Sequence, residues 1–400
     1  MSSVQNLEVY NDKSKRSARR ERDLELLPTN STRYRVVESV ILLGLRILES
    51  PQGKNSLIRI ATEVVQQRDF PPGDRPPVPH IYNRPLAEMP RWVDFFFGRL
   101  RSNFPVVLLC DIAGEASATK KDWGTDMSQY DPQEASHFEF NKTIINNMIY
   151  VRHQPPNVTG DNYNCFKFQM AITIAHEIVH LLTGFLTGTA RPYTPPGVSL
   201  GNYGNRNMGE SGRYWESILL GGVVEFFEDG NDPLQERQAG RPYLIEDSRN
   251  NVPAQLVSTT YINNFLNGHF SFPILTSSRA APTTRNELRR ISREMTDVRE
   301  RSGRRARAAP AYESPAPEAS SSVSYRRLPP THHSYSGSYS TYYAQGNGEP
   351  SDSHAGAYGS NYGSSHNSGY ENSGYEDSGY GNSGYENSYG DNSSGYGYHR

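Results

Sequence analysis

The chain has 400 residues, of which 35% are hydrophobic, and its formal net charge is −2. The apolar fraction is too low for 400 uniformly folded residues, and most apolar residues precede Leu275, so we expect one folded domain and a long disordered remainder. The near-neutral charge indicates no particular class of partner, and two cysteines exclude a disulfide framework.

The N-terminus has no apolar leader, and no apolar run approaches the ~20 residues of a membrane-spanning helix. These two features predict an intracellular protein, in the cytoplasm or nucleus, with no membrane span.

The first 30 residues are polar and charged, and we predict a disordered tail over 1–30. The folded domain is predicted over 31–280. Apolar residues at helical spacing predict helices early in this domain, over residues 36–47, 55–67 and 90–101.

Strand signals follow these helices. The continuous apolar run 104–112 predicts a buried strand, and residues 137–152 predict two strands separated by a kink. A long apolar helix is predicted over 164–182 and a second helix over 209–228, before short strands and loops in residues 241–275.

The predicted helix over 164–182 carries the pattern His176-Glu177-Ile178-Val179-His180. Positions i and i+4 share one helix face, so both imidazoles can bind one metal ion. Glu177 lies about 100° round the helix, within reach of a water on that ion. The pattern predicts a zinc site with Glu177 as general base.

A third protein ligand is required, and glutamates of the following helix are the candidates. Glu210 and Glu216 are about 240° apart on a helix, so one is expected to bind the ion while the other orients a histidine. We favour Glu210 as the ligand, because glycines on either side of it allow close approach; Glu225 is a third, weaker candidate.

The His-Glu-x-x-His pattern, the segment Glu210-Ser-Gly-Arg-Tyr-Trp-Glu216 and the following Leu220-Gly-Gly222 resemble a group of uncharacterised fungal proteins with a zincin-type motif. The similarity covers residues 90–230. The wider gluzincin group implies an α+β fold with an active-site helix, a small mixed sheet and a second ligand-bearing helix. It also implies bound zinc and peptidase activity, with His176 and His180 as ligands. The gluzincin Asp four residues after the ligand Glu is replaced here by Tyr214.

Residues 137–152 are expected to supply an edge strand that pairs with the backbone of a peptide or protein substrate. Hydrolysis also needs a donor for the oxyanion, and the sequence leaves three candidates open: Tyr203, Tyr214 and His269.

The C-terminal part differs in composition. We predict a basic amphipathic helix or linker over 281–308 and a disordered Tyr/Gly/Ser/Asn-rich tail over 309–400, which repeats Ser-Gly-Tyr with a period of five near its end. The tail is expected either to self-associate or to be passive. It lacks lysine and has little arginine, so we expect no nucleic-acid partner.

The sequence therefore predicts a zinc metallopeptidase. Two alternatives remain at this point: a catalytically inactive zincin-fold scaffold that acts through its self-associating tail, and a zinc hydrolase of a non-peptide substrate.

Overall fold

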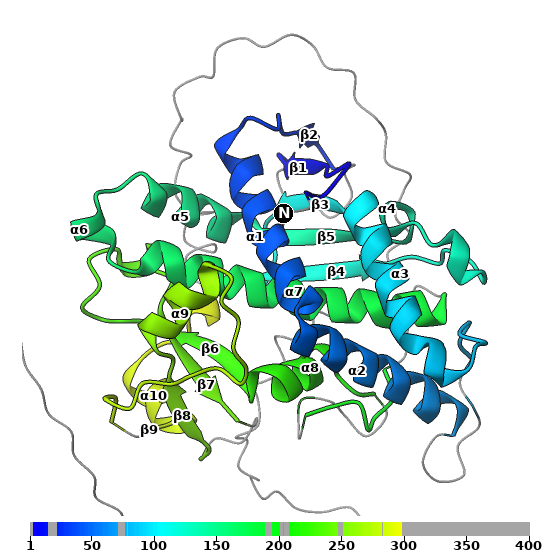
Figure 1. The fold of residues 1–400 in the computed structure, drawn as a ribbon. Coiled ribbons are helices and arrows are strands. Elements are labelled where there is room, and N and C mark those ends of the chain that lie inside the picture. The colour runs from blue at the N-terminus through cyan, green and yellow to red at the C-terminus, as the bar shows by residue number, and fades with distance from the viewer. Residues whose placement is uncertain are drawn as a thin grey trace, which may run out of the picture. The chain divides into compact units, whose positions relative to one another are not determined.

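A computed structural model describes most of the first 297 residues, within one compact unit. The described residues are 3–14, 22–70, 77, 79–188, 194–200, 203, 208–246, 251–281 and 283–297. They form a mixed α+β structure with two separate sheets (Figure 1), which confirms the predicted α+β class. The predicted tail over 309–400 and residues 298–308 of the predicted basic helix lie outside the described residues.

The first sheet has five strands in the order β2-β1-β3-β5-β4. Its central pairs β1–β3 and β3–β5 are parallel, and the outer pairs β1–β2 and β5–β4 are antiparallel. The strands are β1 (Val9–Asp12), β2 (Leu24–Leu26), β3 (Val106–Cys110), β4 (Ala116–Lys120) and β5 (Ser136–Asn141). The strand predicted over 104–112 is confirmed as β3.

The prediction of a disordered tail over 1–30 is wrong for the residues that the structure describes there. β1 pairs with both β2 and β3, and Val9 is fully buried in the main core. Backbone hydrogen bonds and the burial of Val9 hold these two short strands in the sheet. The stretch between the strands is mostly polar and charged, which is why the sequence predicted disorder.

The second sheet has four strands in the order β6-β7-β8-β9, and each pair is antiparallel. The strands are β6 (Val223–Phe227), β7 (Arg241–Ile245), β8 (Pro253–Leu256) and β9 (Thr283–Thr284). The short helix α10 (Arg285–Ile291) follows β9, and Met295 beyond it is fully buried. The folded domain therefore continues past residue 280, where the predicted boundary placed a linker helix.

The three helices predicted in the N-terminal half are confirmed as α1 (Thr32–Glu49), α2 (Pro51–Asp69) and α3 (Met89–Ser102). Ser31 caps α1 through its side chain. Ser50 ends α1 and caps α2, which begins with Pro51.

Two predicted elements have the wrong type, and one predicted helix is shorter than expected. The second strand expected in residues 137–152 is the helix α5 (Lys142–Arg152), capped by the Asn141 side chain. The helix expected over 209–228 is α8 (Ser211–Leu220) followed by β6, because Gly221, at φ +84°, ends the helix. Within residues 241–275, where short strands and loops were expected, the structure has the helix α9 (Thr259–Leu266), capped by Ser258.

Several further helices are short. They are α4 (Pro132–Ala135), α6 (Pro156–Thr159) and the 3₁₀ turns Leu86–Glu88, Met127–Gln129 and Gln235–Arg237.

The longest described helix, α7 (Asn162–Thr187), runs through the core beside β4, α1 and α8 (Figure 1). It confirms the helix predicted over 164–182. α1 approaches it closely at Gly44, where a Cβ would lie 2.9 Å from Ile174 Cγ2. In the described part, α7 alone has the length and hydropathy of a membrane span, but 78% of its most apolar window is buried inside the domain. This burial is typical of a core helix.

Candidate metal centre

The helix α7 places two histidines side by side. His176 and His180 lie one helical turn apart, and their Nε2 atoms are 3.3 Å from each other. The rest of α7 is mostly buried and apolar, so these imidazoles form a polar stripe on a core helix. Such a stripe requires a polar or ionic partner.

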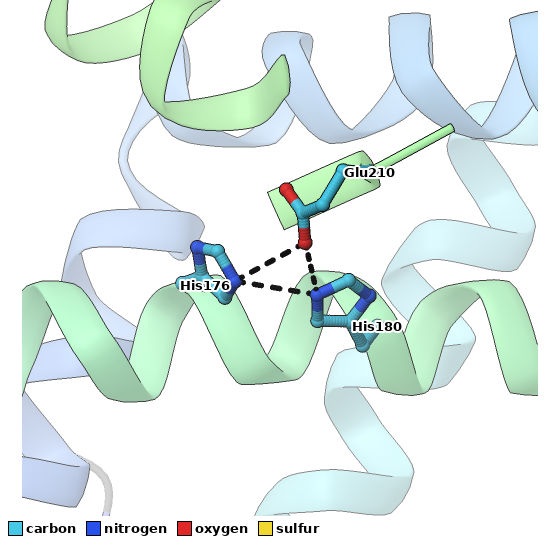
Figure 2. Close-up of side chains that lie close together, drawn as sticks. All are labelled: His176, His180 and Glu210. Carbon is cyan, nitrogen blue, oxygen red and sulfur yellow. Dashed lines mark hydrogen bonds and ion pairs between the residues drawn. The ribbon is translucent and has the colours of Figure 1, made fainter. Parts of the chain in front are cut away.

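Glu210 supplies that partner. It precedes α8 as its N-cap residue, and its carboxylate accepts a hydrogen bond from the backbone N–H of Arg213. Its Oε1 lies 2.7 Å from His180 Nε2 and 3.4 Å from His176 Nε2. Figure 2 shows the Glu210 carboxylate pointing toward the two imidazoles of α7 from a separate segment of the chain. The structure thus brings together the three residues predicted as metal ligands.

Two glycines allow this approach. A Cβ at Gly212 would lie 2.5 Å from Cε1 and 2.6 Å from Cδ2 of the His176 ring. A Cβ at Gly209 would collide with the carbonyl oxygens of Pro195 and Val198. The backbone N–H of Glu210 donates to Val198 O over 3.0 Å, so the loop before α8 holds the carboxylate in place.

The separations of the three ligand atoms suit a zinc ion. Zinc bonds of about 2.0–2.1 Å at tetrahedral angles place two ligands about 3.3 Å apart. His176 Nε2 lies 3.3 Å from His180 Nε2 and 3.4 Å from Glu210 Oε1, which agrees with this spacing. The distance between His180 Nε2 and Glu210 Oε1 is shorter, at 2.7 Å. Two imidazole nitrogens and one carboxylate oxygen are also a donor set that zinc accepts.

Each histidine is held through its other ring nitrogen. His176 Nδ1 lies 2.6 Å from Glu216 Oε1, and His180 Nδ1 lies 3.2 Å from Ser211 Oγ. The Glu216 carboxylate is buried and also binds Arg213 Nη1 at 2.9 Å. Such contacts fix the tautomer that leaves Nε2 for a metal.

The two alternative ligands take other positions. Glu216 lies on the Nδ1 side of His176, which is the orienting role predicted for the second glutamate. Glu225 lies on β6, where it forms a buried ion pair with Arg285 and does not join the centre.

The electrostatics of the centre favour a cation. Burial raises the pKa of Glu210, but the charges of His176 and His180 and their hydrogen bonds hold it well below its usual range. Burial lowers the pKa of His176, whereas the carboxylates of Glu210 and Glu216 raise it to about 10. The carboxylates therefore attract positive charge to the point between the imidazoles, from a proton or from a metal ion.

Glu177 is tied to the first sheet. Its Oε2 accepts a hydrogen bond from the backbone N–H of Ala118 on β4 over 2.8 Å. β4 pairs with β5 on one side only and is the edge strand next to α7 (Figure 1). The prediction that residues 137–152 supply the edge strand is wrong, since β5 lies between β3 and β4.

The three candidates for the oxyanion donor lie in separate surroundings. Tyr214 accepts a hydrogen bond from Arg59 on α2 over 3.2 Å. Tyr203 lies beneath the guanidinium of Arg213, which is 5.6 Å from its ring centre. His269 lines a different pocket of about 520 Å³ with Tyr261 and other residues from the α9 region.

Sequence reasoning missed three residues of the centre. Ser211 follows the predicted ligand Glu210 directly in the sequence, and this adjacency could have indicated that Ser211 lies at the centre. Ala118 and Lys120 come from β4, and the packing of this strand against α7 brings Ala118 to Glu177 and the Lys120 stem to Gly184.

No family model, curated protein or solved structure matches this chain. The fold and site on their own define a mixed α+β domain with a His₂Glu group that can hold a metal ion.

Proposed function

We propose that this protein is a zinc-dependent hydrolase that cleaves peptide bonds. The observation that carries the proposal is the convergence of His176 Nε2, His180 Nε2 and Glu210 Oε1, with Glu177 adjacent on the same helix. A zinc ion held there would acidify a bound water and polarise a substrate carbonyl.

Three protein ligands support a catalytic role over a structural one. Structural zinc sites have four protein ligands, whereas catalytic sites have three and an open position. Among the described residues, the metal-binding group contains three side chains, and no fourth His, Cys, Asp or Glu joins it. The His180 side chain is 19% exposed, so solvent reaches this ligand.

Glu177 carries the acid–base step in this proposal. The Ala118 N–H holds Oε2, so Oε1 is the oxygen that takes a proton from the attacking water. Glu177 then returns the proton to the leaving amine. Glu216 and Ser211 keep the imidazoles oriented throughout.

The edge of β4 supports a peptide as the substrate. Ala118 directs its N–H away from β5, toward Glu177, so the outer backbone groups of β4 lie beside the reaction centre. An extended chain can pair with such an edge, which would place its backbone carbonyls near Glu177.

The test uses the full-length protein purified without chelators. We expect about one zinc per chain by elemental analysis, in the wild type and in Glu177→Gln. The wild type should cleave members of a mixed peptide library, as followed by mass spectrometry, and Glu177→Gln should lose about 1,000-fold or more of this activity. Glu134→Gln, an exposed glutamate on α4, is the matched control and should behave as wild type. A wild type without stoichiometric metal, or a Glu177→Gln variant with unchanged cleavage, would contradict the proposal.

A further inference from the structure

Lys120 ends the edge strand β4 and lies beside the metal centre. Residues two apart on a strand share a face, so Lys120 lies on the face of Ala118, which packs in the main core. A Cβ at Gly184 would lie 3.3 Å from Lys120 Cδ and 3.4 Å from its Cγ. Gly184 is one helical turn beyond His180 on α7, so the lysine stem crosses α7 immediately past the metal-binding pair.

The Lys120 side chain is half-buried beside the metal centre. In the part of the chain that the structure describes, no acceptor makes a hydrogen bond or ion pair with it. Burial lowers the pKa of Lys120, against the opposing effect of the negative charges on Glu177 and Glu210. Both carboxylates therefore lie within electrostatic reach of the ammonium. This ammonium can therefore pair with a negatively charged oxygen of a ligand at the centre.

The charge balance of the centre favours an anionic ligand. Three carboxylates, from Glu177, Glu210 and Glu216, face two cations, Lys120 and Arg213. Together they leave one net negative charge, which a divalent ion would turn into one net positive charge. Arg213 is already paired with Glu216, so Lys120 is the cation left to meet a negatively charged oxygen.

Resting on the zinc hydrolase proposed above, we propose that Lys120 is a catalytic residue that binds the carbonyl oxygen of the scissile peptide group. A cation held in place beside the reacting carbonyl stabilises the negative charge that this oxygen gains. Lys120 thereby takes the role for which the sequence offered Tyr203, Tyr214 and His269.

The step balances without any further reactant. Water adds to the carbonyl carbon, its proton passes to Glu177, and the π electrons of the carbonyl move to the oxygen beside Lys120. The carbonyl then re-forms as the C–N bond breaks, and Glu177 gives the proton to the leaving amine. Lys120 keeps its own proton from start to finish.

The test measures anion binding separately from catalysis. Full-length protein loaded with Co²⁺ is titrated with inorganic phosphate, and the visible absorption of the cobalt reports binding. We expect Lys120→Met to keep its cobalt and to lower the phosphate affinity about tenfold or more, which reflects the loss of one charge-assisted hydrogen bond. Lys120→Arg keeps the charge and should remain within about threefold of wild type.

Lys121→Met is the matched control. It removes the same charge one residue along the chain, just past the end of β4, at a lysine whose charge acts on His137, and should leave phosphate affinity unchanged. Gly184→Ala is a second variant that leaves Lys120 in place. Its Cβ presses on the lysine stem and should lower the affinity about threefold. With a cleaved library peptide, Lys120→Met should lower kcat about 100-fold or more, and Lys121→Met should not.

The outcomes separate the two proposals. Equal phosphate affinity in cobalt-loaded wild type and Lys120→Met would overturn the role of Lys120. If Lys120→Met does not hold cobalt, the test falls to Gly184→Ala. A phosphate affinity in Gly184→Ala equal to that of wild type would then overturn the role of Lys120. A wild type that holds cobalt but cleaves no peptide would overturn the peptidase function, and the phosphate titration would still decide the role of Lys120. A wild type that binds no cobalt would overturn both.

Discussion

The substitution Gly212→Ala tests the geometry of the metal centre without changing any ligand. The added Cβ would lie 2.5 Å from Cε1 and 2.6 Å from Cδ2 of His176. Carbon atoms in ordinary contact are about 3.5–4.0 Å apart, so the ring must move by roughly 1 Å.

A shift of this size should disable the zinc site. Metal–ligand distances in working sites vary by only about 0.2 Å, and a displaced His176 Nε2 leaves that range. We expect Gly212→Ala to weaken zinc binding at least about 100-fold, or ~2.8 kcal/mol, measured by competition with a chromogenic chelator.

Gly98→Ala is the matched control for this experiment. Gly98 is an exposed residue within α3, and a Cβ there meets nothing within 4 Å. This variant should gain up to ~1 kcal/mol of stability from helix propensity, with unchanged zinc affinity. A folded Gly212→Ala protein that binds zinc as tightly as wild type would refute the close packing of α8 on His176.

Three further predictions concern groups around and beyond the ligands. Glu216→Gln should weaken zinc binding about tenfold in the same competition assay, because an amide accepts a weaker hydrogen bond from His176 Nδ1; equal affinity would contradict the orienting role. Arg285→Met leaves Glu225 buried and unpaired, and should lower the free energy of unfolding in urea by about 3–5 kcal/mol; a loss under about 1 kcal/mol would argue against β9 and α10 as parts of the domain. Burial lowers the pKa of His137 to about 4, against the opposing charge of Glu139, so the fold holds this imidazole neutral while the unfolded chain protonates it near pH 6.5. Wild type should therefore lose up to about 3 kcal/mol more stability than His137→Gln as the pH falls from 6.5 to 4, and parallel pH profiles of the two proteins would contradict this.

The metal ligands were predictable because their signals are local. His176 and His180 depend only on the spacing of one helix, and Glu210 stands between the two glycines that let α8 approach α7. The choice between Glu210 and Glu216 followed from helical geometry, since residues six apart face different directions. The structure places one at the Nε2 atoms and the other at Nδ1 of His176.

The wrong predictions of secondary structure fall on apolar runs that are compatible with either a helix or a strand. Ile144 and Ile145 in α5 are β-branched, yet the Asn141 cap and burial against α1 and α7 favour a helix. β6 continues an apolar stretch directly after α8, and the break is marked only by Gly221 and the glycine that follows it.

The sequence did not predict that β4 is the edge strand beside the metal centre. The residues of this strand are mostly small or polar, and nothing in their spacing indicates an edge strand. Ala118 and Lys120 reach the centre through the pairing of β4 with β5 and its packing on α7. The packing on α7 joins residues more than 50 positions apart, as in the hydrogen bond from Ala118 to Glu177.

The most direct test of the metal centre is X-ray absorption spectroscopy at the zinc edge on zinc-loaded full-length protein. The proposed ligands His176, His180 and Glu210 predict two imidazole nitrogens and carboxylate or water oxygens at about 2.0–2.2 Å. The imidazole signal should be reduced by half in His180→Ala. A sulfur ligand at about 2.3 Å, or an imidazole signal unchanged in that variant, would contradict the assignment.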